Sequence, residues 1–202
     1  MRWDRRTVCT CRTPWVTHTF ALTASLERIA PRTALIVGAG SVGLEMAEGL
    51  TARGIAVTQV EMLPEVLPTV DPSPGALVRA ELERNGVQVR TGATVQRITP
   101  APDRGLHVEG VGPDSEPLTW EVDLVVVVVG MRPETDLLVA AGASTGPRGA
   151  VLIDPGMSTG LADVWAAGDY VATHHRLMGT TYLPLGTTAH KQGRDLNQGA
   201  RP

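Results

Sequence analysis

The sequence predicts an α/β fold in which a parallel sheet carries helices together with an antiparallel β-meander. Three patterns predict it. A short apolar run at 34–37 is followed by a glycine-rich turn and then by apolar residues at helical spacing. A run of valines at 124–129 has the continuous apolar character of a parallel strand that is buried on both faces. Between these runs, weaker strand patterns alternate with turn-rich segments, as in a meander.

The glycine turn at 38–43, with the sequence GAGSVG, is the most specific motif of the chain. It fits G-x-G-x-x-G, in which Gly38 allows a tight turn, Gly40 lets the backbone approach a pyrophosphate, and Gly43 lets the next helix pack close to the strand. That helix, predicted over 42–53, directs its free N–H groups and its positive dipole end at the phosphates. Ser41 and Val42 at its start are therefore further candidate cofactor contacts.

An acidic residue closes the second predicted strand, 55–60, and lies 18 residues after Gly43. This residue, Glu61, would accept hydrogen bonds from the adenosine ribose hydroxyls and would repel a 2′-phosphate, so it favours NAD over NADP. The series of strand, glycine turn, helix, strand and acid predicts a Rossmann-like NAD(P)-binding domain. The alternative is an ordinary strand–helix–strand unit in which the glycines are incidental.

The remaining elements of this domain follow in chain order. Asp71-Pro72 is a helix-start signal, and Asn85-Gly86 ends that helix before a short strand at 87–90. The order is then βαβαβ, which is half of a doubly wound sheet. The strands of the meander are expected at 94–98, 106–111 and 118–122.

The valine run ends at Gly130, which is followed by Met131-Arg132-Pro133. Because Gly130 has no Cβ, the backbone can approach a ligand or a neighbouring element where the chain leaves the sheet. Gly130 is therefore a candidate cofactor contact. Arg132 is either a solvated loop residue or a contact to a phosphate or to another domain.

Composition excludes several classes of protein. A net charge of −3 gives no electrostatic reason to bind nucleic acid, and no apolar run approaches the roughly 20 residues that span a bilayer. The two cysteines, Cys9 and Cys11, fit neither a redox C-x-x-C pair nor a zinc site, and such low cysteine usage favours a cytoplasmic location. His174, His175 and His190 lack accompanying acidic or cysteine ligands, so we expect no metal site.

Residues 1–30 mix arginines, threonines and tryptophans without a sustained hydrophobic period. They are expected to form a poorly ordered leader, in which 24–29 could make a short helix. No clean apolar core of a signal peptide develops in this stretch.

Three stretches resemble one family: GLEMA at 43–47, VGMRP at 129–133 and TGLADVWAAGD at 159–169. They are similar to motifs of the pyridine nucleotide–disulfide oxidoreductases, flavoproteins with two dinucleotide-binding domains. The segment at 182–194 most resembles the coenzyme A-disulfide reductase and NADH oxidase branch, where it starts a helix whose N-terminal end faces the flavin.

The resemblance implies a domain division and a second cofactor. Residues 31–130 would form the NAD(P)-binding domain, and residues 131–202 would form part of an FAD-binding domain. In the family a strand, here expected near 164–167, ends in Gly-Asp, and the aspartate accepts a hydrogen bond from a ribitol hydroxyl of FAD. By position these residues are Gly168 and Asp169.

The departures from the family pattern leave the activity open. No second glycine fingerprint precedes Gly38, and Cys9 and Cys11 do not match the family's catalytic cysteines, so no catalytic residue is assigned. The resemblance implies part of an FAD-dependent oxidoreductase that passes a hydride from NAD(P)H to flavin and on to a disulfide or another acceptor. The alternative is a non-catalytic dinucleotide-binding module or remnant. A homodimer or a complementing chain could also supply the missing half.

Overall fold

The computed structural model describes residues 8–10, 26–27, 29–102 and 105–199. The chain divides into two compact units, Met1–Gly130 and Met131–Pro202. Most of the leader expected over 1–30 lies outside the described residues, although residues 26, 27 and 29 are helical.

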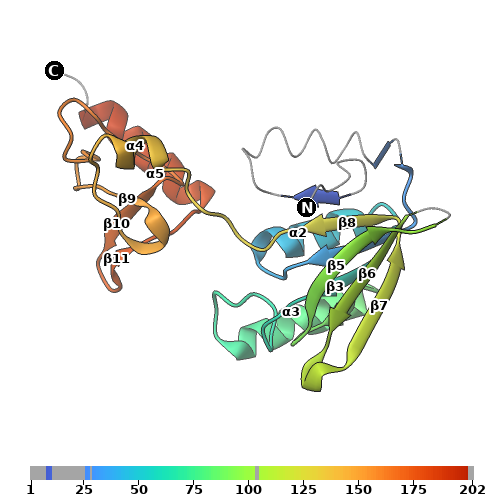
Figure 1. Cartoon of the computed structure of the whole chain (residues 1–202). Coiled ribbons are helices and arrows are strands. Elements are labelled where there is room, and N and C mark those ends of the chain that lie inside the picture. The colour runs from blue at the N-terminus through green and yellow to red at the C-terminus, as the bar shows by residue number, and fades with distance from the viewer. Residues whose placement is uncertain (1–7, 11–25, 28, 103–104, 200–202) are drawn as a thin grey trace. The chain divides into compact units, whose positions relative to one another are not determined.

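Within the described residues, a five-stranded parallel sheet organises the first unit (Figure 1). The strand order is β1-β8-β2-β3-β4. The strands are β1 (Val8–Thr10), β2 (Thr33–Val37), β3 (Ala56–Val60), β4 (Gln88–Arg90) and β8 (Leu124–Val127). The helices α2 (Ser41–Thr51) and α3 (Pro72–Arg84) connect β2, β3 and β4 in turn.

The antiparallel meander forms a second, three-stranded sheet in the order β5-β6-β7. Its strands are β5 (Thr94–Pro100), β6 (Leu106–Val111) and β7 (Pro117–Val122). Alternation along β2 separates two cores: Ile36 packs with α2 residues on one face, and Leu35 packs with the meander on the other. The first unit therefore has three layers, helices, parallel sheet and meander, and the predicted α/β fold is confirmed.

Several strand boundaries differ by one or two residues from those expected, and one strand was not expected. The valine strand ends at Val127 rather than 129. The last bond to β2 is donated by the Val128 N–H to the Val37 carbonyl, and the chain then turns away, so that Val129 is 72% exposed. The strand β1 was not predicted at all. It pairs in parallel with β8, and such an edge strand depends on the backbone groups that a neighbouring strand offers rather than on a local hydrophobic pattern.

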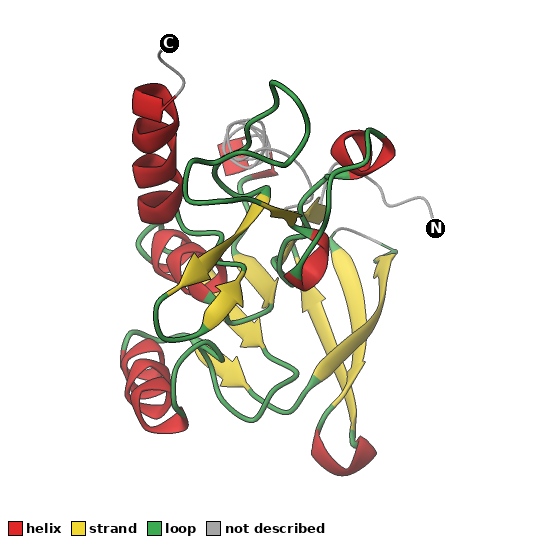
Figure 2. Cartoon of the chain, turned by 90° about the vertical axis from the view of Figure 1, so that its left-hand side faces the viewer, coloured by secondary structure: helices red, strands yellow, loops and turns green. Residues whose placement is uncertain are grey.

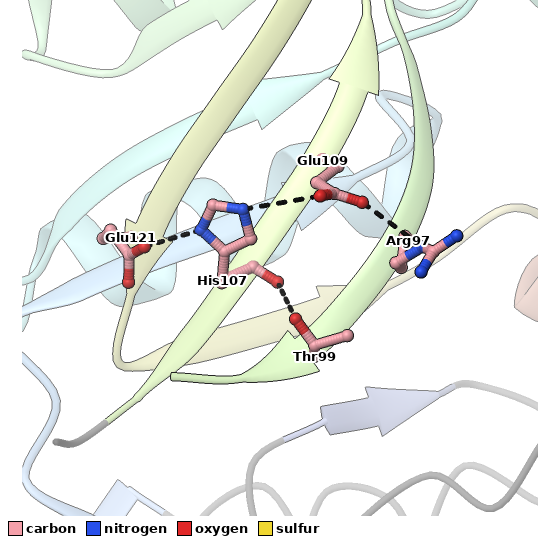
Figure 3. Close-up of polar contacts among 5 residues, drawn as sticks. All are labelled: Arg97, Thr99, His107, Glu109 and Glu121. Atoms are coloured by element: carbon pink, nitrogen blue, oxygen red, sulfur yellow. Dashed lines mark hydrogen bonds and ion pairs between the residues drawn. The ribbon is translucent and has the colours of Figure 1, made fainter. Parts of the chain in front are cut away.

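The outer face of the meander carries charged residues that bridge its three strands (Figure 3). The Nδ1 atom of His107 lies 2.6 Å from Glu121, and Glu109 lies 3.2 Å from Arg97. These are cross-strand neighbours in register, and they are partly solvated, so each pair stabilises the sheet by about 1 kcal/mol at most.

A carboxylate ties the start of β2 to the turn between β7 and β8. Asp123 Oδ2 accepts the backbone N–H groups of Arg32 at 2.8 Å and Thr33 at 3.1 Å, and the Asp123 N–H donates to Thr33 Oγ1 at 3.1 Å. These bonds join residues about 90 positions apart in the sequence, so they tie the start of the domain to its last strand.

Replacing Asp123 by alanine is therefore expected to lower the free energy of unfolding by about 2 kcal/mol, because two backbone donors lose a charged acceptor. Urea denaturation followed by circular dichroism measures the change. The matched control is Asp71→Ala, because Asp71 precedes α3 without a side-chain capping bond and its loss should matter much less. Equal effects of the two substitutions would contradict the assignment.

The second unit is built around short strands and one long helix (Figure 2). Strand β10 (Val171–His175) pairs in parallel with β9 (Val151–Leu152) and antiparallel with β11 (Gly179–Thr181). The helices are α4 (Asp136–Ala140) and α5 (Gly186–Gly199). Its small core gathers Ala150, Ala172 and Tyr182.

The strand expected near 164–167 is wrong. Trp165 makes only an isolated bridge to Ser158. The backbone instead folds back locally, because the Thr159 N–H bonds the Val164 carbonyl at 3.1 Å and the Ala166 N–H bonds the Met157 carbonyl at 3.0 Å. These local bonds use the groups that a parallel strand would direct to a neighbour.

Candidate functional site

The glycine turn lies where β2 and β3 end, and the first of its glycines is required by backbone geometry. Gly38 has a φ of +105°, a conformation that side chains disfavour. A Cβ added there would also lie 2.6 Å from the carbonyl oxygen of Val128. The turn therefore passes directly over the end of β8 and leaves no room for a side chain.

Gly43 is required by packing. It lies in the first turn of α2 and is buried. A Cβ there would collide with the Gly38 carbonyl oxygen and come within 3.0 Å of the Gln59 side-chain nitrogen. The close approach of helix and turn is the one that the motif predicts.

Gly40 differs from both, because nothing in the described protein requires it to be glycine. It precedes α2 with a φ of −74°, which any residue can adopt, and no atom lies within 4 Å of an added Cβ. The space beside Gly40 is open to a ligand.

The start of α2 presents unpaired backbone donors. Among the described residues, the N–H groups of Ser41, Val42 and Gly43 have no acceptor, and no side chain caps the helix. The first helical bond is made by the Leu44 N–H to the Gly40 carbonyl, at 3.0 Å. Such a row of donors at the positive end of a helix dipole is suited to an anion, a phosphate above all.

Glu61 lies beside this turn and is only 6% exposed. One carboxylate oxygen accepts the Ala39 N–H at 2.7 Å, and the other accepts the Leu63 N–H at 2.9 Å. Sequence reasoning assigned this acid to a ribose and missed its internal bonds. Because a carboxylate offers about four acceptor positions, two bonds leave capacity for hydroxyl donors.

The segment at 61–70 holds the turn from the other side, and sequence reasoning missed it too. The Leu67 N–H donates to the Ala39 carbonyl at 2.8 Å, with Leu67 itself at a φ of +53°. Val66 is buried against Gly75 of α3, where a Cβ would lie 2.7 Å from the Val66 carbonyl oxygen. Helix α3 therefore supports the segment that supports the turn.

A third missed residue is Gln59, which is fully buried in β3. Its side-chain nitrogen donates to the Gly38 carbonyl at 3.1 Å. The only signal in the sequence was a polar residue inside an otherwise apolar strand end.

Gly130 follows β8, whose last carbonyls lie against the turn. It has a φ of +96° and no atom within 4 Å of an added Cβ. Its backbone conformation therefore suits glycine, and its surroundings are open. Arg132 is exposed. It can be a solvated loop residue or a contact to a phosphate or to another domain, and both alternatives stay open.

In the second unit, Gly168 and Asp169 occupy a turn before β10 rather than the end of a strand. The Gly168 N–H donates to the side-chain oxygen of Gln192 on α5 at 2.8 Å, and the Tyr182 hydroxyl donates to the Asp169 backbone carbonyl at 2.9 Å. The Asp169 side-chain oxygen Oδ1 is buried without a partner among the described residues. A buried unpaired carboxylate oxygen is costly, and this one retains the capacity to accept a hydrogen bond from a donor outside the chain.

Burial, and secondarily the neighbouring Asp169 carboxylate, raises the pKa of Tyr182 above its ordinary value of 10.0, while Arg148 acts in the opposite direction. The unfolded chain therefore loses this proton at a lower pH than the folded protein. The stabilisation is complete below pH 10 and is lost as the pH rises through the raised pKa of the folded protein.

We accordingly expect the urea midpoint to fall as the pH rises above 10.0 and through the raised pKa of Tyr182, and to fall less in Tyr182→Phe. The variant leaves Tyr170 as the other of the two tyrosines, so the difference between ultraviolet titrations of the two proteins isolates Tyr182. An equal fall in both proteins would contradict the assignment.

The three histidines occupy structural positions. His174 and His175 lie in β10, His190 lies in α5, and the ring of His175 accepts the N–H groups of Leu177 and Met178. Over the described ranges, no group of three or more potential metal ligands is found. In the same ranges, no helix combines the length and apolar character needed to cross a membrane.

Comparison with known proteins gives a consistent result. Residues 13–193 match the model of the family described as pyridine nucleotide-disulphide oxidoreductase. An NADH oxidase of Methanocaldococcus jannaschii is 34% identical over 176 residues, which cover 86% of this chain and 38% of that protein.

Solved structures agree with the sequence match. A water-forming NADH oxidase from Lactobacillus brevis bound to NADH aligns over 97% of this chain and 41% of its own, with a TM-score of 0.83 and 30% identity. An NAD-dependent persulfide reductase from A. fulgidus aligns over 96% of this chain and 36% of its own, with a TM-score of 0.82 and 29% identity. This chain thus spans about two fifths of the length of these relatives, and the resemblance noted in the sequence is confirmed. The chain belongs to the pyridine nucleotide-disulphide oxidoreductase family.

Proposed function

We propose that the first unit binds NADH across the glycine turn, with the pyrophosphate at the start of α2 and the adenosine ribose beside Glu61. The observation that carries this proposal is the row of unpaired N–H groups at 41–43 next to open space at Gly40. Gly38 and Gly43 shape the backbone beside that space, and we propose Gly130 as a further contact where the chain leaves β8.

We propose NADH rather than NADPH because of the charge of Glu61. Its carboxylate is buried and held in place by two backbone donors, so it cannot swing away from an added phosphate. A 2′-phosphate beside it would bring two negative charges together at low exposure to water.

For the second unit we propose contact with FAD through Gly168 and Asp169. The buried, unpaired Oδ1 of Asp169 fits a hydroxyl donor such as that of the ribitol chain, and the Gln192 and Tyr182 bonds hold this turn in place. Helix α5 begins at Gly186, and the first backbone hydrogen bond at this end is donated by the Ala189 N–H to the Leu185 carbonyl. Bound in this way, NADH would supply a hydride and FAD would supply its acceptor, from which electrons would pass to a disulfide or another acceptor.

A visible spectrum tests the whole proposal. The purified chain is incubated with excess FAD, desalted and scanned before and after anaerobic NADH. A retained flavin band that bleaches with NADH supports hydride transfer. A colourless protein that still binds NADH by calorimetry supports the rival function, a dinucleotide-binding module without catalysis, which requires only the backbone donors and the open space of the first unit. Loss of both signals contradicts both functions.

We also propose that a second copy of the chain or a complementing chain completes the flavin site, and that the protein acts in the cytoplasm. The first proposal is supported by the exposed apolar residues of the second unit, among them Leu137 at 84% and Leu177 at 88%. Analytical ultracentrifugation with and without FAD tests it, because a defined complex should form. Fractionation of the source cells tests the location.

A further inference from the structure

Gln59 is a polar residue in an apolar place. It lies on the face of β3 that carries Val57, the face covered by helices, and its neighbours in register are Ile36 on β2 and Val89 on β4. None of its surface is exposed. A buried amide destabilises a fold unless its hydrogen bonds are made, so the bonds of Gln59 need an explanation.

One bond holds the glycine turn. The side-chain nitrogen donates to the Gly38 carbonyl at 3.1 Å, and the amide orientation is fixed because that carbonyl can only accept. The other side of the same peptide, the Ala39 N–H, donates to Glu61 at 2.7 Å. The peptide that joins Gly38 to Ala39 is thus held at both its oxygen and its N–H by two side chains from the end of β3.

This arrangement matters because Gly38 has no side chain that restricts its backbone. Its φ is +105°, and the direction of the next peptides follows from how its own is oriented. The unpaired N–H groups of 41–43 come immediately afterwards. Fixing the Gly38 carbonyl therefore fixes the direction in which those donors point.

The second polar atom of Gln59 indicates that the residue does not serve stability alone. Its oxygen Oε1 is buried and has no partner in the part of the chain that the structure describes. A leucine or methionine at this site would leave no such unsatisfied acceptor. The side chain that holds the turn therefore also places an unpaired oxygen in the core.

We propose that Gln59 is a positioning residue for the dinucleotide: it fixes the Gly38 carbonyl so that the N–H groups at the start of α2 are aligned on the pyrophosphate. This inference rests on the proposed binding of NADH. It predicts that affinity and stability separate at this position, which a purely structural residue would not allow.

The test compares Gln59→Leu with Gln96→Leu in the full chain. Gln96 lies exposed on β5, so the second variant makes the same chemical change away from the turn. Isothermal titration with NADH should give a Kd about tenfold higher for Gln59→Leu and unchanged for Gln96→Leu. The thermal midpoint of Gln59→Leu should change little, because the loss of the donor to the Gly38 carbonyl is offset by the removal of the unpaired Oε1. An unchanged Kd would overturn the proposal.

Two further measurements keep the test decisive. Gln59→Met, with a flexible side chain of similar length, replaces the leucine variant if that one does not fold. Hydrogen exchange of the Ala39 amide reports on the turn without any ligand, and it should become faster in either variant. Faster exchange in a protein whose wild type binds no NADH would support the positioning of the turn while contradicting the proposed function. Unchanged exchange would overturn the positioning itself.

Discussion

Replacement of Gly43 by alanine is expected to lower the free energy of unfolding by about 3 kcal/mol or more. The added Cβ would collide with the Gly38 carbonyl oxygen. That oxygen cannot retreat easily, because Gln59 and Glu61 hold its peptide from both sides. Relief requires α2 to move away from the sheet, which opens the core around Ala47 and Leu50.

Urea denaturation followed by circular dichroism measures this loss. The control is Gly40→Ala, three residues earlier, where an added Cβ meets nothing within 4 Å and the change should stay within about 1 kcal/mol. Two variants of equal stability would show that Gly43 has room for a side chain beside the Gly38 carbonyl oxygen.

Replacement of Gly40 by valine should abolish NADH binding while leaving the protein folded, whereas Gly43→Ala mainly lowers stability. Its side chain would fill the open space beside the unpaired N–H groups of 41–43 and keep a pyrophosphate away from them. We expect the Kd for NADH to rise at least about 100-fold, which corresponds to about 2.7 kcal/mol. The thermal midpoint should fall by only about 2–4 °C, since valine is a poorer N-cap than glycine.

Calorimetry and a thermal melt of the same sample measure both quantities. Gly49→Val is the matched control, because Gly49 lies in the same helix two turns further on, where an added Cβ contacts only the end of Arg53. It should bind NADH as the wild type does. If Gly40→Val bound NADH with unchanged affinity, the cofactor would not cross the glycine turn at all.

Much of the first unit could be predicted because its signals are local. The glycine turn, the helix after it and the strand before Glu61 depend on spacing within about 30 residues, and the structure has each of them. The different steric reasons for Gly38 and Gly43 also followed from the motif, since a tight turn and a close helix leave distinct spatial requirements, whereas the role of Gly40 stays a prediction.

The elements that could not be predicted depend on partners distant in sequence. The three-residue strand β1 exists through pairing with β8, more than 100 residues later in the register. The stretch at 164–167 has the composition of a strand but pairs back on 157–159, and its local pattern does not distinguish these outcomes. Gln59 and Leu67 contact the turn through folding of the chain between them, so only the structure shows that they belong to the candidate site.

Glu61 holds the turn through the Ala39 N–H, and we propose that it also contacts the ribose, so a change of coenzyme at this position would disturb both. A lineage that drifted towards NADPH would have to lose the carboxylate, and the Ala39 N–H would lose its acceptor in the same step. A variant that had lost only Glu61 would bind NADH poorly before it bound NADPH well. A second substitution that supplies another acceptor would have to come first or together with it. Under this proposal, coenzyme preference is tied to the backbone geometry of the turn, and a designer who wishes to change it should first supply another acceptor for the Ala39 N–H and only then remove the charge.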